Sequence, residues 1–314
     1  MKTQVIALIA STAALLTTLS ARAAEEPRPI PLWPDMKVET TQGSDTIRER
    51  GTPERPNRLL VDVRHAMLIP IPPPAEKSTR TAIIICCGGG YAGEAIDKEG
   101  YEVARWLNSI GVTAIILEYR LPRPSITGKE KPFPLIDAQR AIRFVRSKAK
   151  EWNLDPNRIG IMGFSAGGHL ASTVITHIDP DTPDAKDPID RLSDRPDFAI
   201  LGYPVISLKD SLAHKGSRKN LLGPDPDPFM LDLYSNELHV SEKTPPTFIF
   251  HAKDDRAVPI ANTEKFYAAL QESHVPSELH VFEKGGHGFG LGEGECAQWT
   301  EQCTAWLKSR GLLE

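Results

Sequence analysis

The sequence predicts an α/β fold in which helices cover both faces of a doubly wound, mostly parallel sheet. Two observations support this prediction. Strand-like and helix-like segments alternate along most of the chain, which is typical of successive βαβ units. The strand-like segments are short, apolar and rich in β-branched residues, as strands buried on both faces are. We therefore expect a single sheet whose carboxyl edge carries the functional site.

The strand-like segments are spaced so that most pairs leave room for a crossover helix. They comprise residues 57–71, 81–87, 112–121, 158–164, 195–205, 244–252 and 277–284. Apolar residues at helical spacing predict helices between and after these strands. In the helix expected over 100–111, Val103, Ala104 and Leu107 share one face. Further helices are expected over 135–152, 166–178, 260–273 and 295–311.

The composition of the chain also predicts its domain organisation. Residues 1–23 have the features of a signal peptide, and residues 24–58, rich in Pro and charge, predict an extended N-terminal arm. Residues 59–314 are expected to form one α/β domain. Two irregular segments, 178–196 and 207–245, follow central strands. We expect both to form small cap-like insertions over the carboxyl edge of the sheet.

The N-terminal residues predict export. Lys2 supplies a positive charge, Val5 to Leu19 is apolar with some Ser and Thr, and Ala21-Arg22-Ala23 matches a cleavage site. A membrane anchor is the alternative, but this stretch is short and polar for a membrane span. We expect cleavage after Ala23 and a secreted or periplasmic bacterial protein without further membrane contact.

Composition argues against several classes of partner. The formal net charge is -4 without a basic cluster, so no nucleic acid partner is expected. The chain has four cysteines but no C-x-x-C or H-E-x-x-H, so no metal site is predicted. Export permits disulfides. On one helix, however, Cys296 and Cys303 would have Cα atoms about 10 Å apart, too far for a bridge. Composition leaves the oligomeric state open.

A glycine-rich loop after segment 81–87 has two interpretations. Gly88, Gly90 and Gly93 match G-x-G-x-x-G, the fingerprint of dinucleotide binding. The same Gly-Gly-Gly-Tyr run after a strand is also how some hydrolases form an oxyanion hole. The loop would hold a pyrophosphate in the first case and the oxygen of a tetrahedral intermediate in the second.

A G-x-S-x-G motif favours the hydrolase. Gly163-Phe164-Ser165-Ala166-Gly167 lies between an apolar strand segment and a helix segment of small residues, the context in which this motif presents a nucleophile. The two flanking glycines leave room for a strained Ser. The helix N-terminus there favours developing negative charge. The alternative is an ordinary βα turn with a capping Ser165.

A serine nucleophile needs a base and a carboxylate that orients the base. His287 lies between glycines after the last strand segment, and Asp254 and Asp255 follow the strand before it. The order Ser, Asp, His fits a hydrolase sheet, in which each residue follows a strand and reaches the same edge. We choose Asp255, which precedes a turn-like run into a helix. The rival histidines His169, His251 and His280 are expected to be core or structural.

With these motifs the chain resembles the α/β-hydrolase superfamily, in its acetyl xylan esterase-like branch related to hormone-sensitive-lipase-type carboxylesterases. The likeness extends from about Leu32 to Leu313. It rests on PLWP (31–34), GGGY (88–91), KEGYEVARWL (98–107), EYRL (118–121), DPNRIGIMGFSAGGHLAS (155–172), YPVIS (203–207), DDRAVP (254–259) and GGHGFG (285–290). The resemblance implies an α/β-hydrolase fold and supports Asp255, four residues before the Pro of D-x-x-V-P. Cys87 departs from the family, which usually has His or Pro there.

Dinucleotide binding is the weaker interpretation of the loop. A strand precedes segment 81–87, whereas a Rossmann fingerprint follows the first strand. The residues after Gly93 start a helix with acidic side chains, which would repel a pyrophosphate. We therefore assign the oxyanion hole to the N–H groups of Gly89, Gly90 and Ala166. This chemistry requires no cofactor.

The resemblance implies a serine carboxylesterase in which Ser165, Asp255 and His287 remove short acyl groups, above all acetyl, from carbohydrates such as acetylated xylan or xylo-oligosaccharides. Aromatic rings stack on sugars and His or Arg bind hydroxyls, so candidate substrate contacts are Tyr91, Tyr203, His214 and Arg218. The alternatives are a general short-chain carboxylesterase or lipase-like enzyme and a prolyl-peptidase-like hydrolase. Because segment 178–196 is polar, it argues against an apolar lipase lid. Glycoside hydrolysis needs two positioned carboxylates, which no motif indicates.

Overall fold

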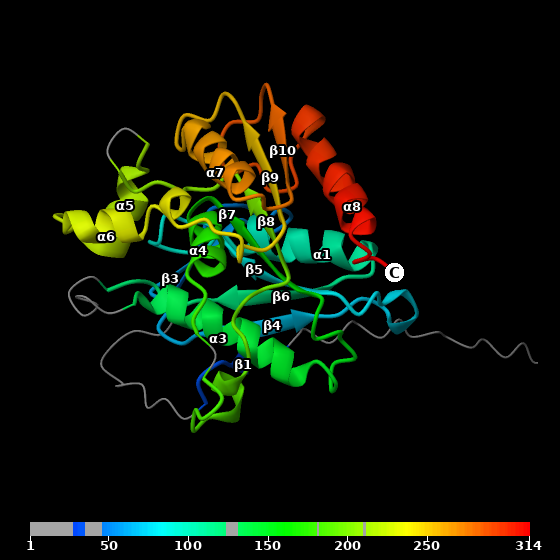
Figure 1. Ribbon diagram of the computed structural model, residues 1–314. Helices are drawn as coiled ribbons and strands as arrows, with labels where there is room; N and C mark the ends of the chain where they lie inside the picture. The colour runs from blue at the N-terminus through cyan, green and yellow to red at the C-terminus, as the bar shows by residue number, and fades with distance from the viewer. Residues whose placement is uncertain (1–27, 35–45, 124–130, 181, 210–211) are drawn as a thin grey trace, which may run out of the picture.

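An eight-stranded sheet forms the centre of the computed structural model, which describes residues 28–34, 46–123, 131–180, 182–209 and 212–314 (Figure 1). Its strand order is β1-β4-β6-β5-β7-β8-β9-β10, in which β4 is antiparallel to both neighbours and β6 to β10 are parallel. The strands are β1 (Ile30–Pro31), β4 (Met67–Ile71), β5 (Ala82–Cys86), β6 (Thr113–Glu118), β7 (Ile159–Phe164), β8 (Phe198–Gly202), β9 (Thr247–Ala252) and β10 (Ser277–Phe282). A separate hairpin pairs β2 (Thr46–Glu49) with β3 (Arg58–Val61). The predicted fold class is confirmed.

Helices cover both faces of the sheet. One face carries α1 (Glu102–Ser109) and α8 (Trp299–Ser309), and the other carries α3 (Phe133–Lys148), α4 (Ser165–Thr176) and α7 (Ala261–Glu272), as Figure 1 shows. Alternate residues of β5 separate the two buried clusters: Ile83 and Ile85 pack toward α1, and Ile84 and Cys86 toward α3 and α4. This two-sided burial explains why the strand sequences are continuously apolar rather than alternating.

Short helices complete the chain. The helix predicted over 100–111 begins earlier, as a π-helix, η2 (Ile96–Tyr101), that leads into α1. Val103, Ala104 and Leu107 form the buried face of α1, as predicted. Among the described residues, the other short helices are η1 (Ala75–Lys77), η3 (Pro188–Arg191), α5 (Lys215–Leu222), α6 (Pro228–Leu233), η4 (Asn236–Leu238) and η5 (Gly294–Gln298). Within the described residues, no helix is long and apolar enough to cross a membrane.

The part of the arm that the structure describes joins the domain instead of standing apart from it. β1 pairs with β4 at the edge of the main sheet, and Leu32 is completely buried. Trp33 packs against the same core and donates its indole N–H to Asp137. The residues of the predicted signal peptide and cleavage site lie outside the described residues.

The two irregular segments lie in different places, so one prediction is wrong. α4 starts at the carboxyl edge and runs to the opposite edge, and the chain after it, 178–196, packs along α3. Arg140 of α3 is bonded there to Asp187 and Asp190. Segment 178–196 therefore covers a flank of the domain. Segment 207–245 follows the carboxyl end of β8 and reaches the glycine loop, where Asn220 donates to the Gly90 carbonyl.

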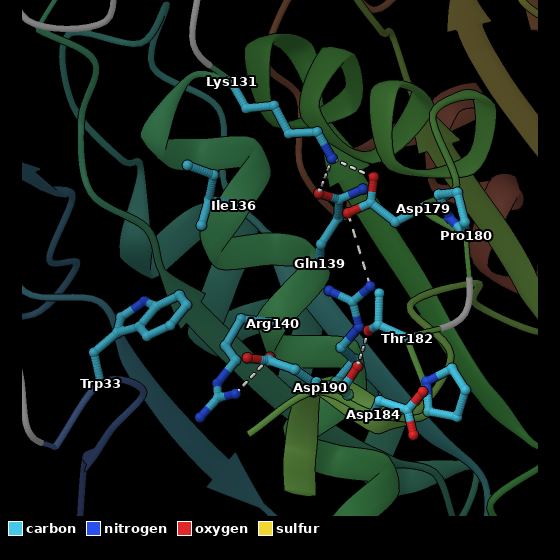
Figure 2. A pocket seen from close by; sticks show the side chains of 13 residues that line it. Trp33, Lys131, Ile136, Gln139, Arg140, Asp179, Pro180, Thr182, Asp184 and Asp190 are labelled. Atoms are coloured by element: carbon cyan, nitrogen blue, oxygen red, sulfur yellow. Dashed lines mark hydrogen bonds and ion pairs between the residues drawn. The ribbon is translucent and has the colours of Figure 1, made fainter. Parts of the chain in front are cut away.

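A cavity of about 810 Å³ lies between α3 and the start of segment 178–196 (Figure 2). Figure 2 shows Trp33 on one side and Thr182 with Asp184 on the other. Its described lining is Trp33, Lys131, Ile136, Gln139, Arg140, Arg143, Asp179, Pro180, Thr182, Pro183, Asp184, Ala185 and Asp190. No predicted site residue is among them, so this cavity is separate from the predicted site.

Candidate active site

Ser165 sits on a sharp turn between β7 and α4. Its φ of +51° lies in the left-handed region, which side chains other than glycine rarely occupy. The flanking glycines permit this turn, because a Cβ at Gly163 would lie 2.1 Å from the Gly167 carbonyl oxygen. A Cβ at Gly167 would lie equally close, 2.1 Å, to the Cys86 carbonyl oxygen. Any larger residue at either position would force the turn apart, so both glycines are needed to hold Ser165.

A chain of hydrogen bonds connects Ser165 to Asp255 through His287. Ser165 Oγ lies 2.7 Å from His287 Nε2, and His287 Nδ1 lies 2.6 Å from Asp255 Oδ2. Because a carboxylate accepts, Nδ1 carries the proton and Nε2 accepts from the serine hydroxyl. The imidazole is thereby in the tautomer that can take the Ser165 proton. The His287 side chain is 25% exposed, whereas Asp255 is buried.

Asp255 is surrounded by donors. Its Oδ1 accepts from the N–H groups of Ala257 and Val258, and its Oδ2 accepts from His251 as well as His287. Burial by itself would raise the pKa of this carboxyl group. Hydrogen bonds from His251, His287 and the Val258 N–H outweigh burial, and the pKa of Asp255 lies well below its usual value. The side chain is therefore a carboxylate at any neutral pH.

The neighbouring aspartate has a different partner. Asp254 Oδ1 accepts from the N–H groups of Gly285 and Gly286, at 2.9 and 2.8 Å. It thus fixes the start of the loop that carries His287, without contacting the imidazole. The sequence alone could rank the two aspartates only by the turn that follows them, and the structure places Asp255 against His287.

The glycine loop packs directly on Ser165. A Cβ at Gly88 would lie 2.9 Å from the Ser165 Cβ. Gly89 and Gly90 have φ of +143° and +66°, and within the described chain their N–H groups donate to no protein acceptor. Ala166 is the second residue of α4, where a helix leaves its N–H groups without intrahelical partners. Backbone donors next to Ser165 are therefore available to a ligand.

Two predicted substrate contacts are corrected by the structure. Tyr203 is fully buried and Tyr91 is 3% exposed, so neither ring can stack on a sugar. Tyr91 has a φ of +58° and its hydroxyl bonds His169 Nδ1 at 2.8 Å. Tyr203 has a φ of +36°, and its hydroxyl donates to Glu99. Both rings turn inward because their hydroxyls find buried partners there, and His169 is the buried support that we expected.

The other two candidates lie on the insertion. His214 caps α5 and borders the glycine loop, since a Cβ at Gly90 would lie 3.7 Å from its Cε1. Burial, and then the charge of His287, lower the pKa of His214. Arg218 donates to the Leu208 carbonyl at 3.4 Å. His214 therefore lies at the site as a neutral ring. A role of Arg218 in substrate binding stays a prediction.

Three residues that the motifs did not single out as functional also support the site. His251 bonds Asp255, Asn220 bonds the Gly90 carbonyl, and Glu99 bonds the Gly88 N–H. Of the three, only His251 lies close in the sequence to a predicted site residue, because it stands four residues before Asp255. Within the described residues, no cluster of His, Cys, Asp or Glu could hold a metal ion.

Comparison with known families agrees with this geometry. The family model BD-FAE matches residues 68–270, which include the glycine loop, Ser165 and Asp255. The chain belongs to the BD-FAE family. A model of the Dienelactone hydrolase family also matches residues 232–313, which include His287. The α/β-hydrolase resemblance inferred from the motifs is therefore confirmed.

Individual relatives of this BD-FAE member cover much of the chain. A crystal structure of an acetyl ester-xyloside bifunctional hydrolase from Caldicellulosiruptor lactoaceticus is 41% identical with a TM-score of 0.78, and the match covers 94% of this chain and 100% of that one. An acetylxylan esterase of Xylanibacter ruminicola is 38% identical over 69% of this chain. Endo-1,4-beta-xylanase B of Butyrivibrio fibrisolvens is 35% identical over 69%. The chain spans only 42% and 33% of the length of these last two proteins.

Proposed function

We propose that the protein is a serine carboxylesterase that removes short acyl groups from carbohydrates. The observation that carries the proposal is the hydrogen-bonded chain Ser165–His287–Asp255. Beside it lie the N–H groups of Gly89 and Gly90, which donate to no acceptor among the described residues. A nucleophile, a base in the correct tautomer, a carboxylate and oxyanion donors are the parts that ester hydrolysis needs. Membership of the BD-FAE family agrees with this assignment.

The geometry suggests the order of events. His287 Nε2 takes the Ser165 proton while Oγ attacks the ester carbonyl carbon. The carbonyl oxygen becomes negative and is held by the N–H groups of Gly89, Gly90 and Ala166. His287 then returns the proton to the departing alcohol, which leaves an acyl-serine. In the second half, His287 takes a proton from water, the hydroxide attacks the acyl carbon, and Ser165 leaves with the proton.

Asp255 acts throughout through His287. Its bond to Nδ1 keeps the ring in one tautomer and orientation, and its charge stabilises the imidazolium that forms twice in each turnover. Because its pKa is held low, Asp255 does not take the proton itself. The bond from His251 reaches the same oxygen, Oδ2, and helps to hold the carboxylate in place.

The substrate that we propose is an acetyl ester of xylan or of xylo-oligosaccharides. Support comes from the relatives described as an acetylxylan esterase and as an acetyl ester-xyloside hydrolase. His214 lies beside Gly90, and because its Nδ1 is bonded to Ser217, Nε2 is the ring nitrogen that we propose for a sugar hydroxyl. The argument against a lid from segment 178–196 no longer applies, because that segment lies along α3. The segment that does reach the site, 207–245, is itself mostly polar in sequence.

An ester series tests the proposal. The value of kcat/KM should fall steeply from acetyl to octanoyl p-nitrophenyl esters, since added methylenes clash or stay wet in a short acyl pocket. Acetate should be released from acetylated xylan. A preference for octanoyl esters, with no acetate released from the polymer, would move the protein to the lipases.

The same preparation should be tested on an aryl xyloside, because one relative is described as bifunctional. Glycoside hydrolysis requires two carboxyl groups flanking the bond. Asp255 and Glu99, the carboxyl groups beside His287, are 7% and 4% exposed and are bonded to neighbouring side chains. We therefore expect little or no release of the aryl group from the xyloside.

Export remains part of the proposal, on the strength of the N-terminal sequence alone. Expression of the full chain in a bacterium, followed by N-terminal sequencing of the periplasmic fraction, tests it. A mature N-terminus at Ala24 supports cleavage after Ala23. Retention of Met1 in the cytoplasm contradicts it.

A further inference from the structure

Glu99 joins the two loops on either side of Ser165. Its Oε2 accepts from the Gly88 N–H at 2.6 Å, at the base of the glycine loop. Its Oε1 accepts from the Tyr203 hydroxyl at 2.9 Å. The same hydroxyl oxygen accepts from the Gly290 N–H at 3.0 Å, in the loop that carries His287. The Glu99 carboxyl group therefore bonds the glycine loop directly, and it bonds the loop that carries His287 through Tyr203.

The helix that carries Glu99 also contacts the histidine loop. A Cβ at Gly290 would lie 3.0 Å from the carbonyl oxygen of Lys98 in η2. The Tyr203 ring stands edge-on to the His287 imidazole, with centroids 5.2 Å apart. The strained φ of +36° at Tyr203 places this ring between Glu99 and His287. Glu99, Tyr203 and the loop that carries His287 therefore pack against one another directly.

Glu99 is a buried carboxyl group held by hydrogen bonds and not by an ion pair in the described residues. It is 4% exposed, and no Arg or Lys forms an ion pair with it among the described residues. Burial raises its pKa above the usual value, and this effect outweighs the bonds from the Gly88 N–H and the Tyr203 hydroxyl and the charges of His287 and Lys98, which lower it. Burial and Glu99 also raise the pKa of Tyr203, which therefore stays protonated and donates.

We propose that Glu99 is a positioning residue for the esterase reaction. It fixes the glycine loop relative to the loop that carries His287, and it adds negative charge beside the imidazole. The proposal rests on the function proposed above, because it assigns a role in that reaction. The charged groups that face His287 are Asp255, Glu99 and, when protonated, His214. Those that face Glu99 are His287 and Lys98, with the Cys87 thiol and Tyr203 as neutral neighbours.

Glu99→Gln tests both parts of the role. The amide keeps the size of the side chain but has one acceptor oxygen for two donors, the Gly88 N–H and the Tyr203 hydroxyl. We expect kcat to fall about 10- to 100-fold with KM for p-nitrophenyl acetate nearly unchanged, since loop register matters most in the transition state. Loss of the charge should move the acid limb of kcat/KM to lower pH, because the imidazolium loses a stabilising neighbour.

Asp97→Asn is the matched control. Asp97 lies on the same π-helix, and its substitution removes the same charge. Its carboxyl group, however, bonds Arg58 of β3 and neither the glycine loop nor the loop that carries His287. We expect this variant to unfold at a lower temperature while its kcat and its acid limb stay those of the wild type.

Tyr203→Phe separates the effect of the hydrogen bonds between the two loops from the effect of the Glu99 charge. It removes the bonds to Glu99 and Gly290 and leaves the carboxyl group, so kcat should fall roughly 2- to 10-fold with a smaller shift of the acid limb. In Glu99→Gln/Tyr203→Phe the losses should be less than multiplicative, because both changes break the same connection.

The outcomes distinguish this proposal from the proposed function. A wild-type protein that hydrolyses no ester contradicts the function, and NMR titration of His287 in the wild type and in Glu99→Gln then still measures the effect of the charge. An active wild type with an equally active Glu99→Gln overturns the positioning role. A loss of kcat that follows thermal instability, with an unmoved His287 titration, also overturns it, since a purely structural residue would behave in that way.

Discussion

The carboxyl edge of the sheet and the outer flank of α3 both gather charged side chains, but they use them differently. Along α3, acids and bases pair with each other. Arg140 pairs with Asp187, and Figure 2 shows Arg140 with Asp190 and Lys131 with Asp179. At the carboxyl edge, Asp255 is bonded to N–H groups and imidazoles rather than to Arg or Lys. In an ion pair, each charge is neutralised by its partner. The Asp255 carboxylate is held by neutral donors, so its charge can stabilise the imidazolium that forms on His287 during the reaction.

The same comparison explains why the cavity along α3 differs from the site. The three cationic groups that line the α3 cavity are each paired with an aspartate, and its described lining contains no Ser, Cys or His. At the carboxyl edge, Ser165 holds a strained backbone position, φ +51°, and the N–H groups of Gly89 and Gly90 beside it have no acceptor in the described part of the chain. The candidate site is therefore identified by the hydrogen bonds that join Ser165, His287 and Asp255.

The largest effect is expected at Ser165. Ser165→Ala should remove the nucleophile and lower ester hydrolysis by ~10⁴-fold or more, because the members of such a triad act as a unit. The protein should stay folded, since the turn is held by Gly163 and Gly167. Titration with p-nitrophenyl acetate and circular dichroism check the two statements. Turnover within an order of magnitude of the wild type would remove Ser165 from the mechanism.

The two adjacent aspartates provide the next comparison. Asp255→Asn should lower kcat about 10³- to 10⁴-fold, because the amide no longer fixes the His287 tautomer or stabilises the imidazolium. Asp254→Asn keeps an acceptor for the Gly285 and Gly286 N–H groups and should cost less than about 10-fold. Parallel kcat measurements decide the ranking, and a reversed ranking shows that Asp254 orients the base.

Much of this site could be predicted because its signals are local. The Ser165 turn needs Gly163 and Gly167 within two residues, and chain order brings Asp255 and His287 to the same edge of a parallel sheet. The inward turn of Tyr203 could not be predicted, because its partner Glu99 is 104 residues away in the sequence. An aromatic residue after a strand has the same local pattern whether it faces solvent or the core.

The fold shows the same division. The alternation of elements fixes the sheet, since apolar strands must be buried between helices. The path of segment 178–196 was predicted wrongly because polar, Pro-rich composition marks an irregular segment without saying which surface it covers. Its position depends on Arg140, Arg143 and Arg146 of α3, whose partners in that segment lie about 50 residues later.

Acid should affect the carboxyl edge through a buried histidine. His169 is fully buried between the Tyr91 hydroxyl and the Tyr234 carbonyl, and burial lowers its pKa to about 4. The unfolded chain takes up this proton first, near pH 6.5. The stability from neutral His169 is therefore complete above pH 6.5 and is lost as the pH falls toward 4, by about 3 kcal/mol.

Urea unfolding at neutral pH and near pH 4.5 measures this loss. His169→Gln offers an amide in place of the ring without a group that titrates, so its stability should be lower at neutral pH but should change less with pH. An equal pH dependence in the wild type and the variant would assign the loss to other groups, such as carboxylates.

The smallest effect is expected on the α3 flank. Asp187→Asn removes one of two carboxylates that bind Arg140, while Asp190 remains in place. Asp187 is 40% exposed, so water and salt screen its charge, and the loss of unfolding free energy should be about 1 kcal/mol or less. High salt should reduce even that difference. Because these charges balance one another and contact no residue of the Ser165 site, kcat/KM for acetyl esters should not change. Thermal unfolding at low and high salt, with kinetics on the same samples, tests both statements, and a fall in kcat/KM without a matching loss of stability would show that the flank and the carboxyl edge are coupled through α3.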